Sequence, residues 1–581
     1  MNGMARRLGL VKAVRLARSK ATLADLPDRL AAVYGSRVAL TLDEPLKLHV
    51  LTAGELTFQD LLEVTARLAG GLRESGVGRG DRVAICTENR IDYGLSLFAV
   101  ARAGGIAVPL HHHLKLVEVD SLATRSGAKF LIADPEVAVK RRGLTTLVAG
   151  RGGSLDRAAA AAAPLMPESI GEDDPVAILF TSGTTGAPKG ATLTSRSLLA
   201  VARLGALYPE AAEEHGVCAL PQAHIMGLSV LLCSLIAGAR LHWIAKFDAQ
   251  RVLHSIAAQR ATFFVGVPAM YAMMADAGAG ETDLSSVKLW ASGADAMPPP
   301  LVDLFRAQGC ALSTPMGQRL LSAAFAEIYG MVELSGPAIL KLHPATPRNA
   351  SRVTGPLKNA LSRAGGLLAR LPGATRVRDA VMRSAAPDKD TGRSFGIPIP
   401  PYRVQIVDEH GKKVKAGTVG ELVIRGPGVT KGYDADPEAT KKSTKDGWLF
   451  TGDLARKNRL GLIAFVTRKK DVIKHGGFSV FPAEVEAQIA AHPAVAEAVV
   501  FGAPHKTKGA VPVAVVVLAK KAKATEKELL AWCRDNIAPY KSPRALAIVS
   551  VGDIPRNANR KVLKDALRDA MLPRLAPQLT K

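Results

Sequence analysis

The sequence of 581 residues lacks several features that would point to particular classes of protein. Its five cysteines form no Cys-x-x-Cys pair, so the spacing typical of zinc sites and disulfide scaffolds is missing. The longest strongly apolar run, residues 225–239, stops at Arg240 and is too short for a convincing transmembrane helix. We therefore expect free thiols in a reducing compartment, and a cytoplasmic protein with at most peripheral membrane contact.

Acidic residues are scarce beside basic ones, because 52 Asp and Glu stand against 76 Lys and Arg and give a net charge of +24. The excess lies in residues 1–20, 335–395 and 468–581, and the rest of the chain is balanced. Such a positive charge can attract nucleic acid, anionic lipid or polyanionic small molecules. No zinc-finger spacing or RNA-binding motif accompanies the three segments, so we expect no nucleic-acid partner.

Helical and strand patterns alternate through the first part of the chain. Residues 56–72 and 91–103 have helical spacing, whereas 82–86, 106–109 and 129–133 have the pattern of short strands. Alternation of this kind predicts an α/β fold with layers of helices on sheets. The six alanines at 158–163 carry no recognisable chemistry, and we interpret them as part of a linker.

The C-terminal part has a different pattern. Strand-like runs at 495–501, 511–518 and 546–551 accompany a helical segment at 526–537, which predicts a small α+β domain. Charged residues interrupt the apolar pattern near residue 468. The predicted division is therefore a basic segment 1–20, a large domain 21–467 with a basic insertion at 335–395, and a small domain 468–581.

A loop rich in glycine and hydroxyl groups is the strongest local signal. An apolar strand at 178–180 leads into Thr181-Ser-Gly-Thr-Thr-Gly186, and Lys189 follows. Glycines let backbone N–H groups approach phosphate oxygens, while hydroxyls and an ammonium group add donors and charge. The spacing differs from that of the common nucleotide P-loop. We therefore predict a phosphate-binding loop of another kind.

This loop resembles the phosphate signature of the AMP-forming adenylating enzymes, and the resemblance runs from about residue 56 to residue 563. Further matching motifs follow in the family's order: Leu220-Pro-Gln-Ala-His224, Tyr329-Gly-Met-Val-Glu333, Gly420-Glu421-Leu, Gly432-Tyr433, Trp448-Leu-Phe-Thr-Gly-Asp453, Arg468-Lys-Lys470-Asp and Pro555-Arg-Asn-Ala-Asn-Arg-Lys561. Within the family the chain is most similar to acyl-CoA synthetases. The resemblance implies a large α/β domain and a mobile small α+β domain.

The resemblance also implies a reaction in two steps, in which a carboxylate is joined to AMP and then transferred to the thiol of coenzyme A. Lys561, Glu333 and Lys189 would be catalytic, with Glu333 and Thr185 holding magnesium. The remaining nucleotide-binding residues implied by the family's motifs are Thr181, Ser182, Gly183, Thr184, Thr185, Gly186, Ala294, Asp295, Tyr329, Gly330, Asp453 and Arg468. Among them, Tyr329 would pack against adenine, with residues 292–296 as the opposing wall. Asp453 would accept from the ribose hydroxyls, and Arg468 would donate to the ribose or phosphate side.

Other motif positions imply the acyl pocket and the coenzyme A site. His224, Gly227 and Leu228 would line the acyl pocket, His475, Gly476 and Gly477 would contact coenzyme A, and Lys470 would be the hinge of the small domain. The acyl motif contains no Arg or Asp to pair with an amino-acid head group. We therefore predict an apolar acid, with a medium- or long-chain fatty acid favoured.

Two alternatives stay open. An insertion at 335–395 also resembles fatty acyl-AMP ligases, which load a carrier protein instead of coenzyme A. Val332 stands where the family usually has Thr, and Thr467 and Arg560 replace usual glycines, so a non-catalytic homologue that binds nucleotide or membrane is the third reading. Within the insertion, residues 356–371 have the spacing of an amphipathic helix. That helix is either packed on the domain or docked on a membrane surface.

Overall fold

The computed structural model describes residues 16–138, 143–181, 188–205, 211–313, 319–346, 396–475, 478–505, 509–556 and 562–579. The chain forms two compact units. The first comprises Met1–Ala386, Phe395–Arg403 and Ile424–Leu449, and the second comprises Pro387–Ser394, Val404–Val423 and Phe450–Lys581. The α/β class, with a large N-terminal part and a smaller C-terminal part, is confirmed, while the boundaries at 21 and 468 stay predictions.

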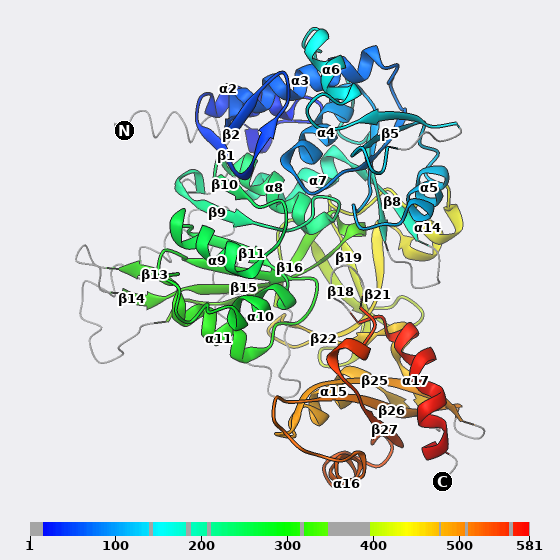
Figure 1. Ribbon diagram of the computed structural model, residues 1–581. Coiled ribbons are helices and arrows are strands. Elements are labelled where there is room, and N and C mark those ends of the chain that lie inside the picture. The colour runs from blue at the N-terminus through cyan, green and yellow to red at the C-terminus, as the bar shows by residue number, and fades with distance from the viewer. Residues whose placement is uncertain are drawn as a thin grey trace. The chain divides into compact units, whose positions relative to one another are not determined.

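The first unit contains a nine-stranded sheet in the order β17-β16-β15-β12-β11-β9-β10-β1-β2. Figure 1 labels β16, β15, β11, β9, β10, β1 and β2 of this sheet. Its centre, from β15 to β1, is parallel, and the pairs at both edges are antiparallel. The strands are β1 (Val38–Lys47), β2 (Thr52–Thr57), β9 (His215–Cys218), β10 (Arg240–Trp243), β11 (Phe263–Gly266), β12 (Leu289–Gly293), β15 (Ala324–Met331), β16 (Gly336–His343) and β17 (Ile397–Pro398).

A six-stranded sheet in the order β6-β5-β3-β4-β7-β8 completes the main frame of this unit. Its strands are β3 (Arg82–Cys86), β4 (Ile106–Pro109), β5 (Phe130–Ala133), β6 (Thr145–Val148), β7 (Pro175–Thr181) and β8 (Lys189–Thr194). The pairs from β6 to β4 are parallel, whereas β7 and β8 form an antiparallel hairpin. A small ribbon of β13 (Cys310–Ser313) and β14 (Arg319–Ser322) stands apart from both sheets.

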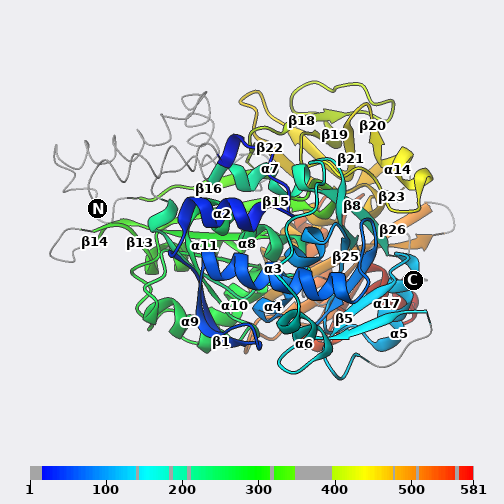
Figure 2. The same cartoon turned by 90° about the horizontal axis from the view of Figure 1, so that it is seen from above.

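Helices lie between the two large sheets. The helix α4 (Ile91–Arg102) contacts β1 of one sheet and both β3 and β4 of the other, and every one of its residues is buried. It lies beside α3 (Phe58–Glu74) in both views (Figure 1 and Figure 2). Similarly, α7 (Ser195–Gly205) contacts β8, β16 and the helix α8 (Ile225–Ala237). Burial on all sides explains why α4 is apolar around most of its circumference.

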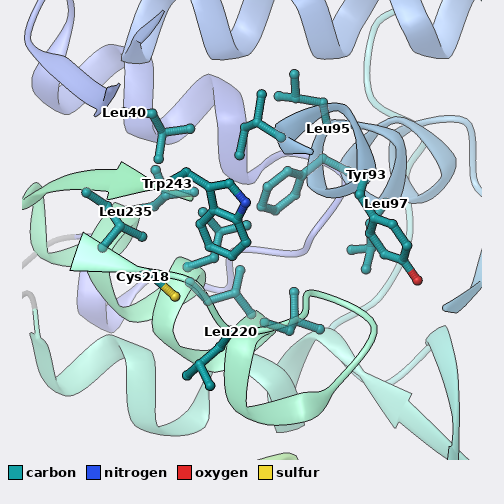
Figure 3. Packing of buried hydrophobic residues seen from close by; sticks show 14 of the residues in the cluster. Leu40, Tyr93, Leu95, Leu97, Cys218, Leu220, Leu235 and Trp243 are labelled. Atoms are coloured by element: carbon teal, nitrogen blue, oxygen red, sulfur yellow. The ribbon is translucent and has the colours of Figure 1, made fainter. Parts of the chain in front are cut away.

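The core between the layers is centred on large side chains from several elements. Figure 3 shows the indole of Trp243 on β10 among Leu40 of β1, Leu95 of α4 and Leu235 of α8. Its Nε1–H donates to the backbone oxygen of Asn89 at 2.8 Å, so the buried polar atom is satisfied. The motif residue Leu220 belongs to the same cluster. The core therefore supports the loop that carries the predicted acyl motif.

Other helices among the described residues of the first unit cover its surfaces and edges. They are α2 (Leu26–Tyr34), α5 (Leu116–Arg125), α6 (Ser154–Ala161), α9 (Ala249–Ala258), α10 (Pro268–Asp276), α11 (Pro299–Gln308) and α14 (Pro437–Ser443). The side chain of Arg102, at the end of α4, is almost fully buried and pairs with Asp28 of α2. This ion pair ties α2 to the helical layer.

Two small sheets are formed mainly by residues of the second unit, although residues 424–425 and 444–449 of the first of these sheets belong to the first unit. The first has the order β18-β19-β21-β20 with β22 on β21, and the second has the order β24-β23-β26-β25 with β27 on β26. Their strands are β18 (Arg403–Val407), β19 (Val419–Arg425), β20 (Thr444–Lys445), β21 (Trp448–Lys457), β22 (Ile463–Arg468), β23 (Ile473–His475), β24 (Phe478–Val480), β25 (Val495–His505), β26 (Gly509–Leu518) and β27 (Ala545–Ile548).

The helices described beside the C-terminal sheet are α15 (Pro482–Ile489), α16 (Glu526–Asn536) and α17 (Lys564–Leu579). A valine-rich stripe along β25 and β26 packs against α17 on one face and against α15 and α16 on the other. The predicted small α+β arrangement is thus confirmed. Among the described residues no helix is long and apolar enough to cross a membrane. The predicted amphipathic helix at 356–371 lies outside the described residues.

The interpretation of residues 158–163 as a linker was wrong. Most of these alanines belong to α6, which packs against α3, and Ala159 is fully buried. The two helices approach so closely that a Cβ added at Gly71 of α3 would lie 2.6 Å from the backbone nitrogen of Ala159. Alanine suits this position because a larger side chain would keep the helices apart.

We therefore expect Gly71→Ala to destabilise the first unit. The new methyl group would overlap backbone atoms that cannot rotate away, at a cost of about 1–3 kcal/mol, although alanine alone favours a helix over glycine. Gly54→Ala is the matched control, because nothing lies within 4 Å of a Cβ added there. Thermal unfolding followed by circular dichroism should show a lower melting temperature for Gly71→Ala only. Equal melting temperatures would contradict the close packing of α3 on α6.

Candidate active site

The predicted phosphate loop connects the two strands of a hairpin. β7 ends at Thr181 and β8 begins at Lys189, and these two residues face each other in the antiparallel register. The Thr181 hydroxyl donates to the backbone oxygen of Lys189 at 3.4 Å. The hairpin therefore brings both ends of the loop together. Residues 182–187 of the loop lie outside the described part of the chain, and they include the predicted residues Ser182, Gly183, Thr184, Thr185 and Gly186.

Two further predicted segments lie at the ends of neighbouring strands. β12 and β15 are parallel partners, with Gly293 opposite Ile328. Ala294 and Asp295, directly after β12, therefore lie at the same edge of the sheet as Tyr329 and Gly330, which are among the last residues of β15. Ala294 has a φ of 71°, which is rare for a residue with a side chain. The structure thus brings the residues expected around adenine to one edge of the sheet. Their contact with a nucleotide stays a prediction.

Glu333 lies directly after β15, in a short 3-10 helix at Val332–Leu334. Its side chain is buried, with the residue only 6% exposed. The carboxylate oxygen Oε1 accepts a hydrogen bond from the hydroxyl of Tyr433 at 2.8 Å, and the Nζ of Lys189 lies 5.3 Å from the centre of the same tyrosine ring. Two of the predicted catalytic residues therefore meet at Tyr433. In the sequence, Tyr433 belongs to a matching motif, but no function was predicted for it.

The carboxylate of Glu333 suits magnesium. Mg²⁺ is usually held by one or two carboxylates together with phosphate oxygens and water, and not by a full protein cage. No group of three or more His, Cys, Asp or Glu with a metal-binding arrangement occurs among the residues that the structure describes. When bound, the ion would neutralise charge on the phosphates. Thr185, the other expected ligand, lies outside the described residues.

The acyl motif begins at the end of β9 and enters α8. His224 is the N-cap residue of α8, and Leu228 is fully buried one turn later. Gly227 is required by packing, because a Cβ there would lie 2.2 Å from the backbone oxygen of Pro221. The side chain of Met226 reaches the end of β12, where a Cβ on Gly293 would lie 3.3 Å from the Met226 Cε. The acyl motif and the predicted adenine wall are thus neighbours.

Three consecutive histidines follow β4 and lie beside the acyl motif. The ring centroid of His111 is 5.8 Å from that of His224, and His111 stacks on His112 at 4.7 Å. Burial, reinforced by the neighbouring histidines, lowers the pKa of His111 to about 3. Burial also lowers the pKa of His224. Both rings are therefore neutral at pH 7.

In the second unit, Asp453 and Arg468 are direct partners across β21 and β22. Asp453 is only 6% exposed, and Arg468 Nε lies 3.6 Å from its Oδ1. Glu421 supports this strand end, since its carboxylate accepts the Gly452 N–H at 3.2 Å and the Lys469 ammonium at 2.7 Å. The predicted ribose-binding pair is thus held together within this unit, and its contact with nucleotide stays a prediction.

The predicted hinge and coenzyme A residues also lie in the second unit. Lys470 belongs to a 3-10 helix at Lys469–Asp471 and pairs with Asp565 at 3.1 Å. His475 is buried, and its Nδ1 is 2.9 Å from the backbone oxygen of Ala510, which fixes the ring against the neighbouring strand β26. Gly476, Gly477 and Lys561 lie outside the described residues. All these roles stay predictions.

Comparison with known proteins decides the family. The chain matches the family described as AMP-binding enzyme over residues 27–363 and 372–434, and residues 484–561 match the AMP-binding enzyme C-terminal domain. The chain belongs to the AMP-binding enzyme family. It is an adenylate-forming acid–thiol ligase of the coenzyme A ligase type, and ligases of this type use ATP, magnesium and coenzyme A.

Several relatives show what similar family members act on. A feruloyl-CoA synthase from Amycolatopsis sp is 33% identical, covering 88% of this chain and 93% of the relative. A 4-coumarate–CoA ligase 2 from Oryza sativa subsp. japonica is 31% identical, covering 96% and 95%. The fatty acid–[acyl-carrier-protein] ligase ScoC from Streptomyces coeruleorubidus is 29% identical, covering 90% and 94%.

Solved structures agree with the fold. The crystal structure of ATP-bound MatB from Rhodopseudomonas palustris matches with a TM-score of 0.74 and 27% identity, covering 95% of this chain and 99% of that one. The agreement over nearly the whole chain confirms the fold that the motifs implied.

Proposed function

We propose that this protein joins an apolar monocarboxylic acid to the AMP part of ATP, with release of pyrophosphate. It then transfers the acyl group to the thiol of coenzyme A, with release of AMP, and medium- or long-chain fatty acids are the first candidates. The observation that carries the proposal is the neutral, largely apolar surrounding of the acyl motif. Leu228 belongs to the core, and His224 and His111 are both neutral at pH 7. Neutral imidazoles offer no positive charge to a second carboxylate on the substrate.

The chemistry of the first step explains the other proposed site residues. Because a carboxylate must approach a triphosphate, cations and donors are needed where the two anions meet. Lys189 and the loop after Thr181 would hold the phosphates, Glu333 would hold magnesium, and Lys561 would face the attacking carboxylate. Asp453 and Arg468 would hold the ribose side. In the second step, His475 and its two following glycines would line the path of the thiol.

An aryl acid is the second candidate. The feruloyl-CoA synthase and 4-coumarate–CoA ligase relatives are named for aromatic acids. The stacked rings of His111 and His112 beside His224 favour this candidate, because flat aromatic faces can pack against an aryl ring. The carrier-protein alternative draws on the relative ScoC. It would share the first step and differ in the acceptor.

A substrate panel tests the proposal. Purified protein would be incubated with ATP, Mg²⁺, coenzyme A and one of octanoate, laurate, palmitate, ferulate, 4-coumarate or malonate. We expect AMP release and a thioester, detected by mass spectrometry, with at least one apolar acid and none with malonate, the diacid control. Accumulation of acyl-adenylate without thioester would favour the carrier-protein alternative. Retained ATP binding without AMP release for any acid would favour the non-catalytic alternative.

A further inference from the structure

The segment 430–434 connects the strand after the phosphate loop to the residues around Glu333. The Thr430 N–H donates to the backbone oxygen of Glu333 at 2.8 Å, and the Thr430 hydroxyl donates to the backbone oxygen of Thr192 on β8 at 2.7 Å. The Asp434 N–H donates to the backbone oxygen of Gly190 at 2.7 Å. This segment therefore fixes β8, which begins with Lys189, relative to the Glu333 backbone.

Its C-terminal end is anchored as well. The carboxylate of Asp434 makes two hydrogen bonds to the guanidinium of Arg82, at 2.8 and 3.0 Å. A two-point contact between Arg and a carboxylate restrains orientation more than a single bond does. Tyr433, the residue before Asp434, is thereby held in place between β8 and the 3-10 helix of Glu333.

The side chain of Tyr433 contacts the functional groups themselves. Its hydroxyl donates to Glu333 Oε1 at 2.8 Å, which restrains rotation of that carboxylate. Its ring lies 5.3 Å from the Lys189 Nζ, within the range of a cation–π contact.

We propose that Tyr433 is a positioning residue for the first half-reaction, orienting the Glu333 carboxylate through its hydroxyl and the Lys189 ammonium through its ring. The proposal rests on the proposed function, because it takes Glu333 and Lys189 as the groups that meet magnesium and the triphosphate. Thioester formation from an acyl-adenylate involves no triphosphate. Tyr433 therefore matters for adenylation and not for the transfer to coenzyme A.

Tyr433→Phe tests the hydroxyl, since it keeps the ring near Lys189. We expect it to slow pyrophosphate–ATP exchange by about ten- to a hundredfold, the loss typical of a hydrogen bond to a charged group, and to raise the Mg²⁺ concentration needed for half-maximal rate. Thioester formation from supplied acyl-adenylate should stay within about twofold of wild type. Tyr433→Leu, which also removes the ring, should slow exchange further.

Tyr34→Phe is the matched control. The Tyr34 hydroxyl donates to the backbone oxygen of Ile236 at 2.8 Å in the same unit, so this variant also loses one hydrogen bond of a largely buried tyrosine. It should leave exchange and its Mg²⁺ dependence unchanged. If Tyr433→Phe left both unchanged too, or slowed transfer to coenzyme A as much as adenylation, the proposal would be overturned.

A binding measurement separates this proposal from the choice of acid. Calorimetric titration with ATP, with and without Mg²⁺, needs no carboxylic acid. We expect Mg²⁺ to lower the dissociation constant of ATP for the wild type and for Tyr34→Phe by a similar factor. For Tyr433→Phe this factor should be about tenfold smaller. Equal Mg²⁺ effects in all three proteins would overturn the role of Tyr433, even if the acid proposed above were the wrong one.

Discussion

Glu333→Gln is expected to slow acyl-adenylate formation by about a hundred- to a thousandfold. The buried carboxylate of Glu333 is the proposed metal ligand, and glutamine has almost the same shape without the negative charge. The amide oxygen can still accept the hydrogen bond from Tyr433, so the local packing should survive. If Glu333→Gln loses more rate than Tyr433→Phe, the additional loss is the contribution of the negative charge of Glu333. Pyrophosphate–ATP exchange over a range of Mg²⁺ concentrations is the suitable assay.

The control for this variant is Glu281→Gln, which neutralises an exposed glutamate between α10 and β12. It should leave the rate and its Mg²⁺ dependence unchanged. Chelating Mg²⁺ with EDTA should bring the wild type down toward the rate of Glu333→Gln and slow the variant little further. A fully active Glu333→Gln with the wild-type Mg²⁺ dependence would show that Glu333 does not hold the ion.

Much of the fold could be predicted because local patterns determine it. The strands predicted at 82–86 and 106–109 coincide with β3 and β4, and the helix predicted at 91–103 differs from α4 by one residue. The helix predicted at 56–72 begins two residues later, at Phe58, because Thr57 and Asp60 form a capping box. Apolar periodicity locates an element well, whereas its ends depend on capping contacts.

Tertiary contacts account for most of what the sequence did not reveal. Tyr433 lies 100 positions from Glu333, and no local pattern connects a tyrosine in one motif to a glutamate in another. The same holds for His111 and His224, whose rings meet although they belong to separate elements. The alanines of α6 appeared to have no function because their role is to let α3 approach closely.

The structure also gives a physical reason for one departure from the family's motif. Val332 stands where a threonine is usual, and its side chain packs against the large core of the first unit. Burial of the apolar valine side chain stabilises the fold, whereas a threonine at this position would supply a hydroxyl donor. The neighbouring Glu333 still receives a hydroxyl donor, that of Tyr433. The loss of one donor at 332 is thus compatible with the enzyme that the family match supports.

Lys561→Ala should produce the clearest separation of the two half-reactions. The resemblance implies that the Lys561 ammonium faces the carboxylate while it attacks ATP. Removing this charge should slow adenylation by about a hundredfold or more, as expected when a group that stabilises developing charge is lost. Transfer from supplied acyl-adenylate to coenzyme A should be nearly unaffected, because the small domain would then present His475 and not Lys561.

The residues on both sides of Lys561 are held by contacts of their own, so we expect Lys561→Ala to leave the fold of the small domain unchanged. Arg556 and Val562 form an antiparallel bridge, the Leu563 N–H donates to the backbone oxygen of Pro555 at 2.8 Å, and Arg556 pairs with Glu497 at 2.6 Å. None of these contacts uses the side chain of Lys561, so the small domain should keep its fold. Lys527→Ala, on the exposed side of α16, removes the same charge from the same domain and should leave both half-reactions unchanged.

Measuring both half-reactions in both variants distinguishes the possible roles of Lys561. If only Lys561→Ala shows slow adenylation with normal transfer, the result would support a small domain that uses Lys561 in the first half-reaction and other residues in the second. Equal slowing of both steps would mean that Lys561 supports the fold or a shared binding site. Wild-type rates in both steps would exclude Lys561 from catalysis.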